Sequence, residues 1–503
     1  MSLRRIFKSG GTLMGGQGVM VISQLLLPPI FLRRYGVAGY GEWLTLTAAV
    51  GYLSTLNFGL HTFTNNQVAI CYNRGELEEA KTLQGTTMLM LTSIVLGAAI
   101  LTSVVFLLPL DVWLGINLNR HIVAITLYLL GLQILVRMLM GLVVGTFLVI
   151  GVSYRGANWN NASYLATILA TATMAFMQVS FAWIAAQQLL VGTVFYLLAL
   201  LDLWRKAPLL VPRLRYARSN RIREILKQSG YFGLLFWANF LVFQLPLILM
   251  QRILGPSSVV VFSITRTIFS MSRQALASMT QAVTQEITEL YSKHEWARLF
   301  RLYELSERVI LAMIPAVSVG TLLVTPVLIS VWLHKPSLYD PYVCIVLALI
   351  SAVMGIKEHK YQFQTSTNQH TELARLMFWS YLAMVAAAVP GIYLFGAIGF
   401  LILWLTTEVV QVFFILRLNQ RLFIQISRID FLPVYKLFAL MGVAVLPSSW
   451  YAIHAGQRSL MQAAVTAILF AAVLACVAYP LFQVGDVRAY LRDRVAARTE
   501  KSA

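Results

Sequence analysis

Fourteen long apolar stretches constrain this chain more than any other feature of its sequence. Each is close to the roughly 20 residues that an α-helix needs to cross a bilayer. Hydrophobic residues make up 58% of the 503 residues and charged residues only 12%, which is more apolar surface than a soluble core can bury. The sequence therefore predicts an all-α integral membrane protein with about fourteen transmembrane helices. The stretches lie near residues 11–32, 43–70, 84–108, 122–148, 162–182, 184–203, 230–251, 258–284, 309–332, 342–362, 374–393, 396–416, 431–452 and 460–484.

Lys and Arg residues are distributed unevenly between the loops that connect these stretches. If the N-terminus is cytoplasmic, 27 of the 39 lie in cytoplasmic segments and six in outer loops, as the positive-inside rule requires. This distribution predicts that both termini are cytoplasmic, and it explains the net charge of +19 without a nucleic-acid partner. The most basic loop carries Ile222, Ile225 and Leu226 on one helical face, and we expect that face to rest on anionic headgroups.

A weak internal duplication relates the first twelve spans at an offset of 219 residues. Each copy holds six spans, an even number, so the two copies must have the same orientation. This predicts two parallel six-helix lobes with a central cavity and alternating access between them, followed by two extra helices. The predicted parts are an N-terminal lobe (1–203), a basic linker (204–229), a C-terminal lobe (230–418), helices 13 and 14 (419–484) and a basic tail (485–503).

Polar residues fall at equivalent positions of the second span in each copy. Arg266 and Arg273 are seven residues apart in the second copy, a spacing that keeps both on one helical face. The offset maps them, with Thr280 and Thr284, onto a nearly neutral polar stripe in the first copy. That stripe consists of Thr47, Ser54, His61 and Asn65.

Further cations lie in the fourth span of each copy, with Arg137 in the first and Lys357 and Lys360 in the second. A charge at mid-bilayer costs about 2.5 to 3.5 kcal/mol, so it normally faces a partner or a wet cavity. The cations outnumber the two acids, Glu358 and Glu408, which predicts an anion-binding substrate cavity. The predicted cavity residues are Arg137, Arg266, Arg273, Lys357 and Lys360.

Two other readings of these charges stay open. Arg266 or Arg273 could pair with Glu408, and Lys357 or Lys360 with Glu358, as structural ion pairs between helices. Glu358 and Glu408 are also candidates for coupling to a proton or sodium gradient. The sequence indicates no other cofactor and no metal site.

The first 85 residues contain a glycine-rich first span and four short segments: LRRYG at 32–36, YGEW at 40–43, NFGL at 57–60 and RGE at 74–76. In these features the chain resembles the polysaccharide transporter family. These are Wzx-type flippases for O-antigen and exopolysaccharide, of the MATE-like MOP superfamily. The resemblance implies a non-enzymatic protein of the bacterial inner membrane that flips an undecaprenyl-diphosphate-linked oligosaccharide. It also implies membrane lipids and the polysaccharide assembly machinery, a polymerase and a chain-length regulator, as partners.

Two alternatives to a flippase remain. A MATE-like multidrug or small-molecule exporter would be expected to have an acidic cavity rather than a cationic one. A membrane-embedded polysaccharide polymerase or ligase would usually need a large outer loop, whereas the outer loops expected here are about a dozen residues long.

Overall fold

A computed structural model describes residues 3–367, 369–424, 426–454 and 459–486. Within these ranges the regular structure is helical, and no strand occurs. The prediction of an all-α fold is therefore confirmed. Chain contacts divide the protein into two compact units, Met1–Val260 and Val261–Ala503. The first unit thus includes the helices that follow the basic linker, and the five-part division expected from the sequence stays a prediction.

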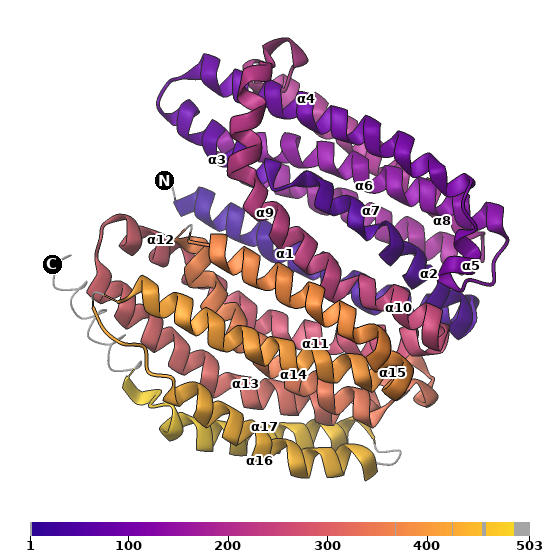
Figure 1. The fold of residues 1–503 in the computed structure, drawn as a ribbon, viewed down its shortest axis with the longest axis vertical. Helices are drawn as coiled ribbons and strands as arrows, with labels where there is room; N and C mark the ends of the chain where they lie inside the picture. Colours follow the sequence, from indigo (N-terminus) through magenta and orange to yellow (C-terminus); the bar gives the residue numbers. More distant parts are fainter. Residues whose placement is uncertain (1–2, 368, 425, 455–458, 487–503) are drawn as a thin grey trace. The chain divides into compact units, whose positions relative to one another are not determined.

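The first unit is built around α6, which packs against α3, α4, α7 and α8, and α4, α6 and α8 run side by side (Figure 1). Its helices are α1 (Leu3–Arg34), α2 (Gly36–Val50), η1 (Gly51–Asn57), α3 (Leu60–Asn73), α4 (Leu77–Thr102), η2 (Ser103–Phe106), α5 (Leu110–Leu114), α6 (Arg120–Val149), α7 (Ser153–Phe176), α8 (Phe181–Lys206), η3 (Pro208–Leu210), η4 (Leu214–Tyr216), η5 (Ser219–Arg221), α9 (Ile222–Phe243) and α10 (Leu245–Leu254).

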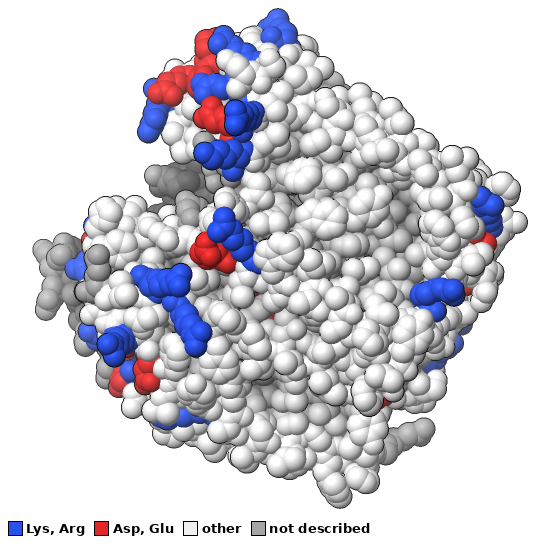
Figure 2. All heavy atoms as spheres, viewed as in Figure 1, with Lys and Arg blue, Asp and Glu red and all other residues white. Residues whose placement is uncertain are grey.

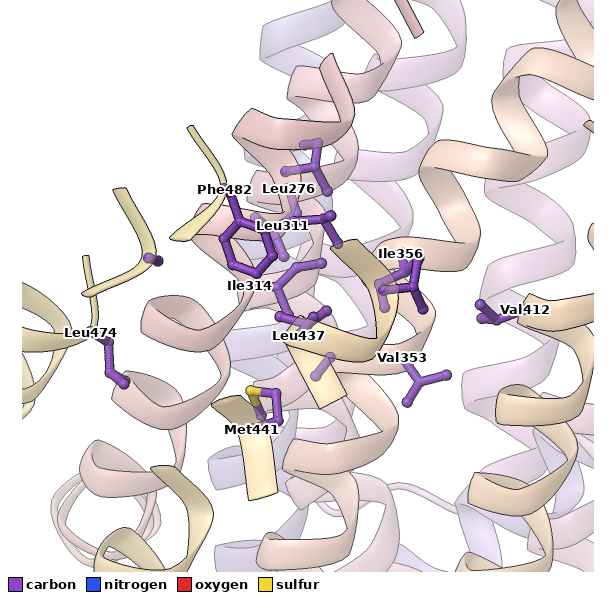
Figure 3. Packing of buried hydrophobic residues seen from close by; sticks show 14 of the residues in the cluster. Leu276, Leu311, Ile314, Val353, Ile356, Val412, Leu437, Met441, Leu474 and Phe482 are labelled. Carbon is purple, nitrogen blue, oxygen red and sulfur yellow. The ribbon is translucent and has the colours of Figure 1, made fainter. Parts of the chain in front are cut away.

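The second unit is built around α13, which packs against α14, α16 and α17. Its helices are α11 (Pro256–Ala282), which begins at the boundary between the units, α12 (Thr284–Ser292), α13 (Trp296–Leu333), η6 (Pro336–Leu338), α14 (Pro341–Ser366), α15 (Thr371–Leu422), α16 (Leu432–His454) and α17 (Leu460–Leu481). Figure 3 shows how Leu311 and Ile314 of α13 meet Leu437 and Met441 of α16 in the buried core. Helices α16 and α17 therefore belong to the apolar core of this unit.

Nine helices of the described residues are long and apolar enough to cross a membrane. One of them, α15, contains two of the expected spans. The stretches expected near 11–32, 43–70, 162–182 and 258–284 are also largely helical. The second contains a break described next, the third ends in a turn, and the fourth is interrupted by a turn at Val283. In each unit the charged atoms visible in Figure 2 gather at the helix ends, and the surface between them is uncharged. The chain is therefore a multi-pass membrane protein.

The stretch expected at 43–70 is not one continuous helix. Helix α2 ends at Val50, a 3₁₀ segment follows, and Phe58 and Gly59 both adopt left-handed backbone conformations before α3 begins. A left-handed residue interrupts the α-helical hydrogen-bond pattern. The inference that Thr47, Ser54, His61 and Asn65 share one helical face is therefore wrong.

Helix α15 is two helices joined by a sharp turn at Gly396, where φ is 60° and ψ is −149°. Only glycine adopts this backbone conformation readily. The two arms then pack closely, since a Cβ on Gly399 would lie 2.1 Å from the carbonyl oxygen of Gly391. The turn separates the two expected spans, 374–393 and 396–416, and makes them antiparallel neighbours.

The basic linker folds against α4. The backbone amide of Arg218 donates to Thr86 Oγ1 at 3.0 Å, and a Cβ on Gly85 would lie 2.8 Å from the carbonyl oxygen of Arg213. Ile225 is only 1% exposed, whereas Leu226 is 44% exposed. The expectation that Ile225 rests on lipid headgroups is therefore wrong, because this side chain packs inside the protein.

Candidate functional site

Lys357 of α14 lies in a fully satisfied buried site in the second unit. Its ammonium group forms an ion pair with Glu408 and donates to Tyr381 Oη at 2.6 Å and to Gln411 Oε1 at 3.1 Å. The side chains of Lys357 and Glu408 are 5% and 0% exposed. Three oxygen acceptors therefore surround an ammonium group that has three protons to donate.

The turn at Gly396 assembles the partners of this ammonium group. Tyr381 lies on the first arm of α15 and Glu408 on the second, and the tyrosine hydroxyl donates to Glu408 Oε1 at 2.6 Å. Trp404 Nε1 donates to the same oxygen at 2.8 Å. No sequence pattern marks Tyr381, Trp404 or Gln411, because their roles depend on the antiparallel packing of the two arms.

A second buried ion pair joins Lys360 of α14 to Glu307 of α13. The Lys360 ammonium also lies 4.1 Å from the centroid of the Tyr303 ring. The lysine side chain is 0% exposed and the glutamate side chain 7% exposed. Glu307 was missed because the apolar stretch was expected to begin at 309, whereas α13 begins at Trp296 and carries Glu307 inside the helix.

A third ion pair connects Arg273 of α11 to Glu358 of α14. It is less buried, with side chains 15% and 28% exposed. His359, which lies between Glu358 and Lys360 in the sequence, makes a 2.8 Å hydrogen bond with Ser306 of α13. Successive residues of a helix point about 100° apart. The four polar residues at 357–360 therefore reach three different neighbouring helices.

These pairs change the expected charge balance of the second unit. The pairings proposed from the sequence are wrong in detail, because each lysine of α14 has a different acid from the one expected, and Arg273 pairs with Glu358 rather than Glu408. The apolar interior of this unit then holds four cations and three carboxylates. The cations are Arg266, Arg273, Lys357 and Lys360, and the carboxylates are Glu307, Glu358 and Glu408. The guanidinium carbon of Arg266 lies 5.1 Å from the centroid of the Phe262 ring. The positive excess within this unit is therefore smaller than the sequence suggested.

Arg137 occupies a different environment in the first unit. It lies in the middle of α6, its side chain is exposed, and its guanidinium carbon is 5.4 Å from the centroid of the Tyr164 ring. Among the residues that the structure describes, no carboxylate pairs with it. An arginine at this depth without a counter-ion is expected to face a wet cavity or an anion.

Two members of the predicted polar stripe pack against α6 near this arginine. A Cβ on Gly141 would lie 2.9 Å from His61 Cε1, and a Cβ on Gly145 would lie 2.0 Å from Asn65 Nδ2. These glycines follow Arg137 by four and eight residues, so they lie on the same side of α6. Polar groups of α3 and the Arg137 side chain are thus brought to one region of the first unit.

The other two members of the stripe make hydrogen bonds to their own local backbone. Thr47 donates its hydroxyl within its own helix, to the carbonyl oxygens of Trp43 at 3.1 Å and Leu44 at 2.9 Å. Ser54 donates to the carbonyl oxygen of Gly51 at 2.7 Å. Both hydroxyls therefore satisfy local backbone, as is common for Ser and Thr in helices.

The fold matches solved transporter structures over most of the chain. The lipid II flippase MurJ in an inward closed conformation has a TM-score of 0.70 at 9% identity, over 96% of this chain and 99% of its own. An inward-facing multidrug-resistance MATE transporter of the MOP superfamily has a TM-score of 0.62 at 13% identity, over 81% of this chain and 96% of its own.

A third neighbour is a MOP-superfamily transporter from Pyrococcus furiosus, described as having a binding pocket of reversed polarity. It has a TM-score of 0.54 at 12% identity, over 82% of this chain and 95% of its own. No protein-family model and no curated protein matches the sequence. These neighbours are transporters and a flippase rather than enzymes, and this chain shares the fold of the MATE transporters and MurJ.

Proposed function

We propose that this chain is a flippase that moves an undecaprenyl-diphosphate-linked oligosaccharide across the bacterial inner membrane for O-antigen or exopolysaccharide synthesis. The lipid II flippase covers nearly the whole chain, whereas the MATE transporter covers about four fifths of it. A lipid-linked cargo is therefore the better supported of the two transport functions. The proposal keeps the alternating-access mechanism expected from the internal duplication.

The observation that carries the proposal is the environment of Arg137. Its side chain is exposed in the middle of a membrane-length helix, and no acid pairs with it in the described structure. A guanidinium group binds phosphate oxygens through two parallel hydrogen bonds. The diphosphate is the anionic part of the proposed cargo that must cross the apolar interior, so we assign Arg137 to its binding.

The remaining members of the predicted cavity have a smaller part in the proposal. Arg273, Lys357 and Lys360 each have a carboxylate partner, and such a pair can hold helices together without binding cargo. Glu358 and Glu408 are engaged in two of these ion pairs. The coupling role expected for both carboxylates stays a prediction.

The test of Arg137 uses a strain that lacks the chromosomal gene and carries a plasmid copy. We expect Arg137→Ala to abolish surface polysaccharide, because the diphosphate loses its cation, while the protein level on immunoblots stays unchanged. Arg137→Lys keeps the charge and should restore part of the polysaccharide. Normal polysaccharide from the alanine variant would remove Arg137 from the proposed site.

An exporter of small molecules is the second candidate, because several of the solved neighbours are MATE transporters. It predicts that deletion of the gene increases sensitivity to cationic drugs and leaves surface polysaccharide intact. The flippase proposal predicts the opposite pair of results. The two measurements on one deletion strain therefore separate the candidates.

A further inference from the structure

A pocket of about 620 Å³ opens in the first unit where α8 ends and the linker begins. Its walls come from the ends of α3 and α8, the starts of α4 and α7, the turn between α6 and α7, and η3. Polar groups line one part of it, namely Tyr72, Tyr154, Arg155 and Lys206, and aliphatic side chains line the rest. The pocket thus combines a charged region with an apolar one.

The outer face of α8 shows the depth at which this pocket lies. Its large apolar residues recur every three or four positions and are all at least 44% exposed: Leu190, Val194, Leu197, Leu201 and Trp204. That spacing marks one helical face, and on a membrane protein an exposed apolar face meets lipid. Tryptophan is typical of the bilayer interface, and Lys206 follows two residues later. The pocket therefore lies at the level of the lipid headgroups.

The charges in and beside the pocket do not cancel. Arg155 binds Asp202 through two hydrogen bonds, Nε to Oδ2 at 2.7 Å and Nη2 to Oδ1 at 2.8 Å. Trp159 Nε1 also donates to Asp202 Oδ2 at 2.9 Å. Lys206 is exposed and lies close enough to Asp202 for an electrostatic attraction, but it forms no ion pair within the part of the chain that the structure describes. The site therefore carries one net positive charge, which is held by an accessible ammonium group.

We propose that this pocket binds the phosphate of an anionic phospholipid headgroup, with Lys206 as the charged donor and the acyl chains along the exposed face of α8. Basic pockets at the cytoplasmic ends of membrane helices bind such headgroups. One net positive charge matches the single negative charge of a phosphodiester such as phosphatidylglycerol, rather than a diphosphate. The site is thus separate from the proposed transport site at Arg137 and does not depend on it.

Native mass spectrometry of the purified full-length protein with equal amounts of phosphatidylglycerol and phosphatidylcholine tests this assignment. We expect the wild-type protein to retain phosphatidylglycerol preferentially. Lys206→Gln should lower the bound phosphatidylglycerol about fivefold, the effect of one basic residue near an anionic lipid surface. Lys206→Arg should retain the lipid, because it keeps the charge at the same place.

Arg205→Gln is the matched control. Arg205 is the neighbouring exposed cation at the end of α8, but it does not line the pocket. We expect this variant to bind phosphatidylglycerol as the wild type does. If it loses as much lipid as Lys206→Gln, the attraction is a general surface-charge effect and the proposal is wrong.

Two further arms complete the experiment. Millimolar inorganic phosphate should not displace phosphatidylglycerol, because it lacks the acyl chains; displacement at equal concentration would identify a free-anion site and overturn the proposal. Equal retention of the two lipids by the wild-type protein would also overturn it. Size-exclusion chromatography checks that Lys206→Gln folds, and Lys206→Met replaces it if it does not.

Discussion

The two units place charged side chains in membrane helices in opposite ways. In the second unit, Lys357 and Lys360 are buried and each has a carboxylate partner on a neighbouring helix. In the first unit, Arg137 is exposed, and the nearby contact between α3 and α6 relies on glycines that admit His61 and Asn65. The difference indicates that buried ion pairs hold α14 among its neighbours, whereas the cation of α6 is available to a ligand.

Breaking the most buried ion pair should have the largest effect on stability. Glu408→Gln leaves the Lys357 ammonium buried without its counter-charge, which should cost about 3 to 5 kcal/mol. We expect a large drop in the thermal unfolding temperature in detergent. Replacing both partners, Lys357→Met with Glu408→Gln, should recover much of the loss.

Glu372→Gln on the same helix α15 is the control for that experiment. Glu372 pairs with Arg375, and both side chains are at least half exposed, so its loss should change stability by no more than about 1 kcal/mol. If Glu408→Gln is as mild as this control, the pair does not hold the helices together. Gradient-driven transport by a stable Glu408→Gln variant would then test the predicted coupling role directly.

Filling the glycine contact of the first unit should have a medium effect. The Cβ of Gly145→Ala would lie 2.0 Å from Asn65 Nδ2, and overpacking of this kind costs about 1 to 3 kcal/mol. Thermal unfolding of the purified variant measures the loss, and the added change Asn65→Ala should relieve it.

Gly97→Ala in α4 is the matched control, because no atom lies within 4 Å of its added Cβ. It should leave the unfolding temperature unchanged or raise it slightly, since alanine favours a helix over glycine. Equal destabilisation by the two alanine variants would show that close packing at Gly145 is not the cause.

The partly exposed pair Arg273–Glu358 should contribute less than the two buried pairs of the same unit. Glu358→Gln is expected to lower the free energy of unfolding by about 1 kcal/mol, because this pair is partly exposed and water screens it in part. A double-mutant cycle with Arg273→Gln gives the coupling energy. A coupling as large as that of Lys357 with Glu408 would mean that burial does not rank these pairs.

The smallest effect on stability is expected at Arg137. Arg137→Gln should change the free energy of unfolding by no more than about 0.5 kcal/mol, because no carboxylate in the described structure loses a partner. A loss comparable to that of Glu408→Gln would show that Arg137 holds the fold together, and the contrast between the two units would fail.

Much of the helical framework follows from the sequence alone. The apolar stretch expected at 122–148 lies in α6, which spans Arg120–Val149, and the one expected at 342–362 lies in α14, which spans Pro341–Ser366. The break in 43–70 was not foreseen. Apolar composition does not distinguish an α-helix from a 3₁₀ segment or reveal a left-handed residue such as Phe58.

The candidate site was predictable only in part. The sequence identified Arg137, Lys357, Lys360 and Glu408 as unusual, because charged residues within apolar stretches are costly in a membrane. It did not identify Glu307, which lies two residues before the expected start of its span. The pairing of each cation also could not be predicted, because partners such as Lys357 and Glu408 are 51 residues apart.

The sequence by itself determined that this chain is a bundle of membrane helices and that the stretches now assigned to α6, α11, α14 and α15 carry charge. Lipid cannot satisfy backbone hydrogen bonds, so apolar stretches of sufficient length are expected to be largely helical. Only the tertiary structure decided which charges are neutralised. An ion pair depends on how helices distant in sequence are rotated and packed, as the turn at Gly396 shows by bringing Tyr381 to Glu408.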